Sequence, residues 1–549
     1  MRSEIEPLLP DAGAKMRQPK SSHAISIVRA VPAVAIVAFV ALGAGAWTCL
    51  STQLWVATDS GLYIKLAASL AEAFDLDHEL HQFRLPGYPL LLALIFRLFG
   101  HSSPTAIMVI QQAMVAATIV LTALTAWTLW PRRAFVLVAG LLCALSPYLR
   151  GYAGTVLTEV PYAFVLSACV YFLVRHHRFG GRSSLAMASF AAGLCLLTKG
   201  IGQVMVVLCV CVAAHRAWCF NRQSGLTSAR SLRRCTAAAA LAVLPPMLLA
   251  LPVMFNNYRT TGHFRMTCQG SQVLFYRAVK VERLHSPHSE ALAKLRAALK
   301  QAKADGLLSP TVELREHYVI NFAYRSVHGT SWFEAADVMN EAAMDLILDN
   351  KALILSHGVR HAYRSFIIPD PYYRVGLGVP QDELFDLEAA RAQMSSLVGR
   401  ETLDKYLPSP AQGPPASHFW SGWMRGHRRV VERGPSLTGV LDHPYEEFMW
   451  FCLLGGVASL AMPNRVTWLI PAMVIFLHIF ISANLGGTIP RYAIPVHPFI
   501  FLFGAFACTG VVRACVTGFT FAAGLLARRL KLSWQGSILA GATDCRIQD

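Results

Sequence analysis

The sequence predicts an all-α polytopic membrane protein, a bundle of about ten transmembrane helices with a mainly helical insertion on one side of the membrane. Three observations lead to this fold class. Apolar runs of roughly 20 residues, the length that a helix needs to cross a bilayer, recur along the chain. Charged residues make up 15% of the chain and hydrophobic residues 54%, whereas about a quarter of a soluble domain is charged. Only residues 260–445 have the composition of a soluble segment.

The positions of the basic residues follow the positive-inside rule for membrane proteins. The formal net charge is +17, and clusters such as Arg132-Arg133 and Arg175–Arg178 lie in short loops between apolar runs. Short cytosolic loops are enriched in Lys and Arg. We therefore expect these loops and the N-terminal tail, residues 1–24, in the cytosol, and no nucleic-acid partner.

Ten apolar runs are predicted to be membrane spans. The first, about Ile25–Leu50, is too long for a signal-peptide core and lacks a convincing small-residue cleavage site, so we expect it to be retained. Another apolar piece, Val516–Ala527, would make an eleventh span. The other nine expected spans are Thr105–Leu129, Ala134–Tyr148, Val156–Val174, Leu185–Thr198, Ile201–Trp218, Thr236–Phe255, Phe448–Met462, Val466–Ile481 and Tyr492–Val512.

The loop after the first span, residues 51–103, is expected to carry two surface helices. One is an amphipathic stretch that follows Asp59 and contains Tyr63. The other, Pro86–Gly100, has only about 15 residues, which is short for a crossing. If it crossed, the basic loops would fall outside, so topology also places it on the outer surface.

These assignments divide the chain into five parts. Residues 1–24 form a cytosolic tail, 25–255 the first part of the membrane domain, 256–445 a periplasmic domain, 446–529 the last spans and 530–549 a C-terminal tail. Within the periplasmic domain, helical patterns cover Glu282–Ala304, Thr311–Asn350 and Asp382–Leu403, whereas Lys351–Ile368 and Phe419–Val431 are typical of helices on a membrane surface.

Four groups at the outer boundary are candidates for chemistry, and each has a structural alternative. An acidic residue beside a bilayer needs water, a metal or a cation, so Asp59 is a functional candidate, although it also stands where a helix N-cap would. Lys199 ends an apolar run and is otherwise a lysine that snorkels to the interface. Glu159 is an intramembrane acid that could instead pair with Arg150. The donors of Arg491-Tyr492 suit a phosphate oxygen, or else form an interfacial anchor.

Histidine and cysteine residues do not predict a metal centre. No cysteine spacing indicates a zinc site or a disulfide framework. His357 and His361 lie four residues apart on a probable helix, but no glutamate-containing zinc-protease motif surrounds them, so we expect a solvated or interfacial face.

Five of these features occur in the order seen in a known family. The chain resembles the GT-C glycosyltransferases, in the branch that contains protein O-mannosyltransferases and the lipid A aminoarabinose transferase. The resemblance covers roughly residues 25–259 and the final spans. It rests on Asp59 with Tyr63, on Arg84–Pro89, on the hairpin from Ser146-Pro147 to Glu159, on Thr198-Lys199-Gly200, and on Arg491-Tyr492-Ala493-Ile494-Pro495.

The resemblance implies an inverting glycosyltransferase that takes a sugar from a polyprenyl-phosphate donor at the periplasmic face. Asp59 stands at the family position for the general base or acceptor-orienting carboxylate, and Lys199 and Arg491 stand near the departing phosphate. The acceptor would be a glycan, lipid or protein. The other residues expected to bind substrate are Tyr63, Arg84, Tyr88, Glu159, Arg259 and Tyr492.

The chain also departs from its relatives in two places. Arg84-Leu85 replace an acidic–lysine pair of the aminoarabinose transferase, which leaves the aminoarabinose donor and the lipid A acceptor unassigned. Ser60 replaces the second acid that often follows the first in protein mannosyltransferases. A paired-carboxylate site is therefore not predicted, no cofactor is assigned, and a divalent metal between Asp59 and Glu159 stays open.

The alternative class is a transporter or flippase of a lipid-linked or small anionic substrate. Such proteins use broken helices and often two related halves. Pro245-Pro246 and Pro252 within one span are the best feature for this class, but no second half mirrors them. A glycan ligase or polymerase is a further enzymatic alternative. The short loops and the abundance of alanine and arginine favour a location in a bacterial inner membrane.

Overall fold

The computed structural model describes residues 20–367 and 444–517, together with residue 520. Short gaps within these ranges fall at 52–53, 55–58, 75, 77–78, 101–102, 225–227, 285, 287, 309–313, 315–316, 463 and 487–489. The predicted helices at Asp382–Leu403 and Phe419–Val431, the tails, and most of the additional apolar piece lie outside the described residues. The regular structure of the described part is helical, which confirms the predicted fold class.

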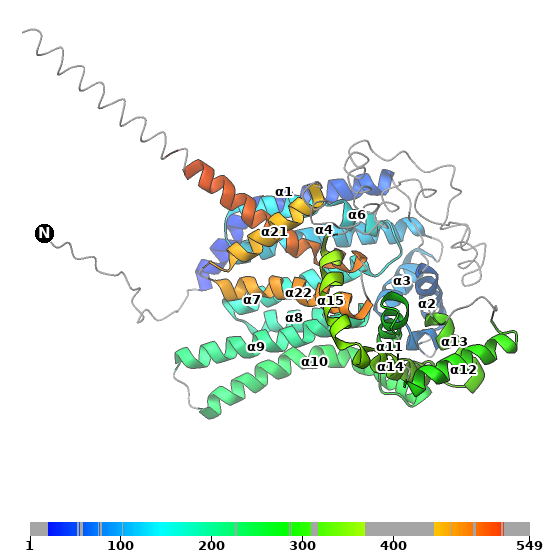
Figure 1. Cartoon of the computed structure of the whole chain (residues 1–549). Helices are drawn as coiled ribbons and strands as arrows, with labels where there is room; N and C mark the ends of the chain where they lie inside the picture. The colour runs from blue at the N-terminus through cyan, green and yellow to red at the C-terminus, as the bar shows by residue number, and fades with distance from the viewer. Residues whose placement is uncertain are drawn as a thin grey trace, which may run out of the picture.

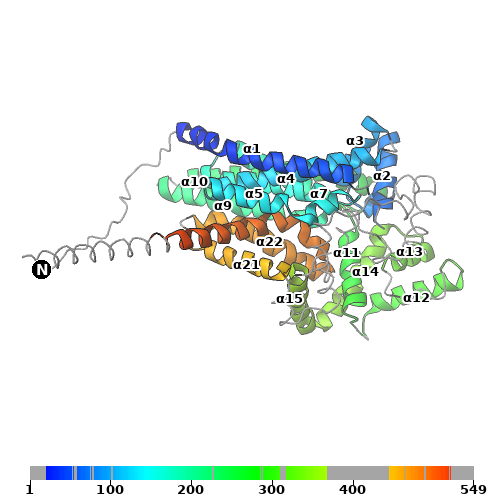
Figure 2. The same cartoon turned by 90° about the horizontal axis from the view of Figure 1, so that it is seen from above.

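Each of the ten predicted spans contains a helix, and these helices run alongside one another as a bundle (Figures 1 and 2). Six helical stretches of the described chain are long and apolar enough to cross a membrane, whereas α5, α8 and α21 are shorter. The helices are α1 (Lys20–Ser51), α4 (Pro104–Leu129), α5 (Arg133–Ala144), α7 (Glu159–Phe179), α8 (Arg182–Thr198), α9 (Gln203–Ser224), α10 (Ser228–Thr261), α21 (Pro444–Ser459), α22 (Arg465–Gly486) and the helical residues 497–517.

Helix α4 shows how the sequence satisfies its polar groups inside an apolar bundle. Ser103 caps the helix by accepting a hydrogen bond from the Ala106 amide at 3.3 Å, and Pro104 follows at the first helical position. Four threonine hydroxyls each donate to the carbonyl four residues earlier, so none needs a partner in lipid. They belong to Thr118, Thr122, Thr125 and Thr128.

Helix α10 bears on the transporter alternative. Although it contains Pro245, Pro246 and Pro252, it is one uninterrupted helix of 34 residues. The broken helix on which that alternative depended is therefore not present at this position.

The basic loops meet at one end of the bundle, as the topology argument predicts. The Arg178 guanidinium donates to the Leu129 carbonyl at 3.0 Å, which joins the ends of α7 and α4. His177 lies 3.0 Å from the Thr467 hydroxyl at the start of α22. Arg133 donates to the Arg29 carbonyl near the start of α1. We call this the basic end of the bundle.

The opposite end carries the first loop and the insertion, and we call it the site end. Helices α2 (Ser60–Ala73) and α3 (Gly87–Phe99) lie together there in both views, next to the green helices of the insertion (Figures 1 and 2). Helix α3 therefore does not lie among the long helices, in agreement with the predicted surface helix. Most of the apolar side chains of α2 and α3 are buried, so both helices pack as part of the fold.

The insertion has a core of its own. It comprises α11 (Gln269–Tyr276), the π-helix η3 (Arg277–Val281), α12 (Glu290–Ala304), α13 (His317–His328), α14 (Trp332–Asp349) and α15 (Lys351–Ile367). Buried side chains including Phe275, Leu295, Ile320 and Leu346 hold the first elements together. Helix α15 instead packs against α22 and against η6 (Pro490–Val496).

Two helices predicted in the insertion differ in their bounds from the observed helices. The prediction did not take account of the serine residues that cap α12 and α14. The helix predicted from Glu282 begins at Glu290, where the Ser289 hydroxyl accepts from the Leu292 amide at 3.2 Å. The pattern predicted over residues 311–350 is two helices. Gly329, with φ of +65°, ends the first, and a capping box of Ser331 and Glu334 starts the second.

Candidate active site

Asp59 lies at the site end and forms an ion pair with Arg84. The Arg84 guanidinium reaches the Asp59 carboxylate at 2.7 Å, and the two side chains are 5% and 22% exposed. Asp59 occupies the N-cap position of α2 but makes no side-chain capping hydrogen bond. Its carboxylate is thus held by a cation from the next segment, and the N-cap alternative does not account for it.

Arg84 is held by aromatic rings as well as by charge. Its guanidinium lies 4.7 Å from the Phe83 ring centroid and 5.3 Å from that of Tyr63, distances at which a cation is attracted to the ring face. It also donates to the Tyr63 hydroxyl at 3.5 Å. The Tyr63 ring meets the Tyr88 ring edge-on at 5.2 Å. The predicted residues Asp59, Tyr63, Arg84 and Tyr88 are therefore neighbours.

Tyr88 extends this group into the bundle through Gln111, which the sequence analysis missed. The Tyr88 hydroxyl donates to Gln111 Oε1 at 2.9 Å, and the Gln111 amide nitrogen donates to the carbonyls of Ala153 and Thr155 at 2.9 and 2.8 Å. An uncharged glutamine inside an apolar run was the only signal. Its bonds fix the turn before α7 against the first loop.

Glu159 and Lys199 form another ion pair at the site end. Their side-chain atoms are 3.1 Å apart, with 3% of the glutamate and 17% of the lysine side chain exposed. Glu159 is the first residue of α7, where a negative charge is favoured by the helix dipole, and Lys199 follows the last residue of α8. Arg150, the alternative partner of Glu159, donates instead to the Ala144 carbonyl.

Lys199 also lies near an aromatic ring that was not predicted. Its ammonium lies 5.9 Å from the centroid of the Tyr162 ring, one turn along α7 from Glu159. The same ring stacks at 5.5 Å on the imidazole of His478 on α22, which was not predicted either. A lone histidine in an apolar run gave no usable signal.

Two close contacts bring together the segments that carry the two ion pairs. The Ser60 hydroxyl, next to Asp59, donates to the Val156 carbonyl at 2.7 Å, three residues before Glu159. At Gly87, a Cβ atom would lie 2.7 Å from the backbone of Leu197, two residues before Lys199. Only glycine allows this approach of α3 to the end of α8. The first loop therefore lies directly against the segments that carry Glu159 and Lys199.

The remaining predicted residues are Arg259, Arg491 and Tyr492. Arg259 is exposed on the last turn of α10 and donates to Asn256 at 3.5 Å, and Asn256 in turn donates to the Leu76 carbonyl after α2. Arg491 and Tyr492 belong to η6, which packs against α7, α15 and α22, but their side chains lie outside the described residues.

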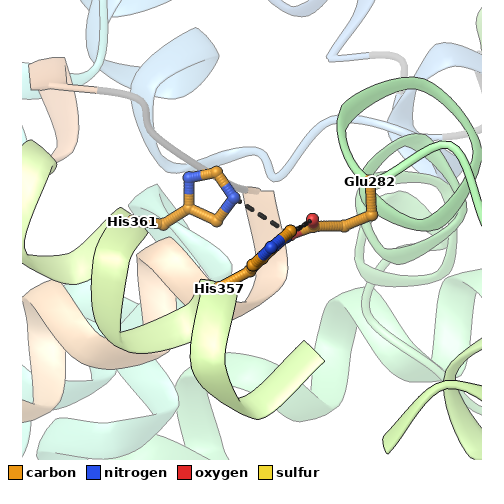
Figure 3. A group of neighbouring side chains, drawn as sticks. All are labelled: Glu282, His357 and His361. Atoms are coloured by element: carbon orange, nitrogen blue, oxygen red, sulfur yellow. Dashed lines mark hydrogen bonds and ion pairs between the residues drawn. The ribbon is translucent and has the colours of Figure 1, made fainter. Parts of the chain in front are cut away.

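A second group of polar side chains lies within the insertion, between the end of η3 and α15. Glu282 follows η3, and both His357 and His361 point toward its carboxylate from successive turns of α15 (Figure 3). These are the two histidines that the sequence analysis assigned to a solvated or interfacial face. Among the described residues, this is the group of three side chains whose ligand atoms, all within 4.8 Å of one another, could hold a metal ion.

The neighbours of Glu282 keep its carboxylate ionised. Burial raises the pKa of Glu282, but His357, His361 and Arg277 outweigh that effect and hold the pKa below its usual value. Burial lowers the pKa of His361, which favours its neutral form. The carboxylates of Asp59 and Glu159 also each face a cation, but no described metal-ligand group includes them.

Comparisons with known proteins agree with the predicted resemblance. Residues 91–267 match the family model of dolichyl-phosphate-mannose-protein mannosyltransferases. The crystal structure of ArnT from Cupriavidus metallidurans bound to undecaprenyl phosphate aligns over 88% of this chain and 77% of that chain, with 13% identity and a TM-score of 0.33. The apo structure of the same protein aligns over 88% and 78%, with 12% identity and a TM-score of 0.30. No curated protein sequence matches significantly.

The family match runs from α3 to the beginning of the insertion, so it includes the segment with Glu159 and Lys199. Together with the helical membrane fold, it supports a membrane glycosyltransferase of the GT-C class.

Proposed function

We propose that this protein is an inverting glycosyltransferase that moves a sugar from a polyprenyl-phosphate donor to an acceptor at the periplasmic face of a bacterial inner membrane. The observation that carries the proposal is the meeting of two ion pairs at one end of the bundle. One contains an acid that can serve the acceptor, Asp59, and the other a cation that can serve the donor phosphate, Lys199. The family match adds independent support.

The proposed reaction is a single displacement. The acceptor hydroxyl or amine attacks the anomeric carbon from the face opposite the phosphate, and the bond between that carbon and the phosphate oxygen breaks. Asp59 takes the proton that the acceptor loses. The lipid phosphate leaves with the bonding electron pair as an anion. The configuration of the sugar inverts because the acceptor attacks from the opposite face.

Positive charge near the departing phosphate lowers the barrier of this step. Lys199 and Arg491 are proposed to supply it, and each such donor contributes about 2–4 kcal/mol in comparable sites. Glu159 holds the ammonium of Lys199 in place from a nearly buried position. Arg259 and Tyr492 are proposed to assist at the same phosphate.

Arg84 is proposed to orient the base. Its guanidinium contacts the rings of Phe83 and Tyr63. The carboxylate of Asp59, which pairs with it, is therefore held at a defined position near the N-terminal end of the first loop. Tyr63 and Tyr88 border the same side, where their rings suit a sugar or the acceptor. The acceptor is a glycan, a lipid or a protein, and the chemistry above is the same for each.

The proposal is tested by reconstituting the purified protein in proteoliposomes with a panel of polyprenyl-phosphate sugars and candidate acceptors. Mass spectrometry of cell-surface glycans in a deletion strain identifies the sugar and acceptor to include. Glycosylated acceptor and free polyprenyl phosphate should form in equal amounts. Movement of the lipid-linked sugar across the membrane without any transfer would instead establish a flippase.

A further inference from the structure

The group formed by Glu282, His357 and His361 is not used by the proposed transfer reaction. His357 Nδ1 lies 2.5 Å from one oxygen of the Glu282 carboxylate, and His361 Nε2 lies 2.9 Å from the other (Figure 3). The two histidines are four residues apart, so α15 presents both rings on one face. The glutamate comes from a different part of the chain, 75 residues before His357.

The charge of the carboxylate is already compensated without the histidines. Arg277, whose side chain is fully buried, reaches Glu282 at 3.3 Å and also donates to the Ile354 carbonyl of α15. With Glu282 only 2% exposed, one guanidinium suffices for a buried ion pair. Two imidazole nitrogens that converge on the same carboxylate are therefore in excess of what charge balance requires.

The same three groups are a recognised donor set for a transition metal. Two histidine nitrogens and one carboxylate oxygen, with a fourth position left to water, are typical of zinc. A tetrahedral zinc ion with bonds of about 2.0–2.1 Å would place its ligand atoms roughly 3.3 Å apart. The observed group, within 4.8 Å, needs only small side-chain adjustments. Calcium and magnesium prefer oxygen ligands and fit this set poorly.

The surroundings also have the features of a metal site. Arg277 hydrogen-bonds the ligating carboxylate from behind, as outer partners of metal ligands do. The His357 side chain is 35% exposed, which gives an ion and a water ligand access from solvent.

We propose that Glu282, His357 and His361 bind a zinc ion that fastens the core of the insertion to α15. Because α15 packs against η6 and α22, the ion ties the insertion to the segment that carries Arg491. This role is structural and does not depend on the glycosyl-transfer proposal.

The test measures metal binding by the full-length protein in detergent. The protein is purified through an affinity tag without histidines, stripped with a chelator and titrated with zinc chloride, and the bound metal is counted by mass spectrometry. We expect one tightly bound zinc per chain in the wild type and in His328→Ala, an exposed histidine of α13 outside the group. We expect at least a 100-fold loss of affinity in His361→Ala, His357→Ala and Glu282→Gln.

A second measurement separates metal binding from folding defects. A ligand that binds only the folded state raises the unfolding midpoint, so zinc should raise it in the wild type and in His328→Ala but not in the three variants. Cobalt should give the visible absorption bands of a four-coordinate site in the same two proteins. The proposal is overturned if stripped wild-type protein takes up no stoichiometric zinc, or if His361→Ala binds zinc as tightly as the control. A wild-type protein that takes up no stoichiometric zinc overturns the proposal even if a variant fails to fold.

Discussion

Glu159 and Lys199 are 40 residues apart in the chain, yet their side chains meet at 3.1 Å where α7 begins and α8 ends. The pair exists because α7 and α8 pack along their length and present opposite termini at the site end. Lys199 thereby gains a fixed position, and the predictions below ask what that position and its neighbours contribute.

Asp59→Asn should reduce transfer at least 100-fold, because general-base assistance contributes about 10²–10⁴ in rate and an amide cannot accept the proton. The measurement is product formation by purified protein in proteoliposomes, with size-exclusion profiles to verify folding. Glu72→Gln, a change at an exposed acid of the same helix, is the matched control and should stay active. Full activity of a well-folded Asp59→Asn protein would remove Asp59 from the reaction.

Lys199→Ala and Arg491→Ala should impair use of the donor more than use of the acceptor. In the proposed reaction each removes positive charge from the departing phosphate, which should cost about 2–4 kcal/mol of transition-state stabilisation. Steady-state kinetics with the polyprenyl-phosphate sugar and the acceptor varied in turn give the two specificity constants. A larger loss in the constant for the acceptor would contradict the assigned roles.

The combination of Lys199→Met with Glu159→Gln separates stability from catalysis. Lys199→Met alone leaves a nearly buried carboxylate without its ammonium and should destabilise the protein by about 3 kcal/mol. The double variant should regain most of that stability, because neither charge is left buried, but should stay inactive. Thermal unfolding and transfer assays on all three proteins test this, and restored transfer in the double variant would assign Lys199 a structural role only.

Gly87→Ala should destabilise the protein by about 1–3 kcal/mol, the usual cost of overpacking. The added Cβ would lie 2.7 Å from the Leu197 backbone, which cannot move without shifting the end of α8. Gly43→Ala is the control, since a Cβ on that exposed position of α1 meets nothing within 4 Å. Equal unfolding midpoints for the two variants would show that the close approach is not maintained in solution.

Ser331→Ala should lower stability by about 1 kcal/mol, because it removes the hydroxyl that accepts from the Glu334 amide in the capping box at the start of α14. Ser326→Ala, at an exposed position within α13, should have little effect. The unfolding midpoint of the whole protein is the readout. No difference between the two would mean that α14 is held by its packing alone.

The sequence predicted the features that depend on local composition. Apolar runs located all ten bundle helices, and the arginine clusters placed their loops at a common end, because both signals come from neighbouring residues. The start of α12 and the division between α13 and α14 were missed, because in each case a single capping serine starts a helix inside a longer helical pattern.

Contacts between residues that lie far apart in the sequence could not be predicted in this way. Asp59 and Arg84 were both candidates, but their ion pair depends on how α2 packs on α3. Gln111 and Glu282 carried no motif, and each acquires its role only when distant segments meet it. A pattern of residues cannot report such contacts, because they are fixed by packing.

At Gly87, two backbones touch with no side chain between them. A displacement of the helix that follows Arg84 should therefore be passed directly to the residues before Lys199. If Asp59 serves the acceptor and Lys199 the donor, as proposed, an acceptor that draws Arg84 away from Asp59 would also alter the binding of the lipid-linked donor. The two substrates should thus change each other's affinity, and by linkage each should do so by the same factor.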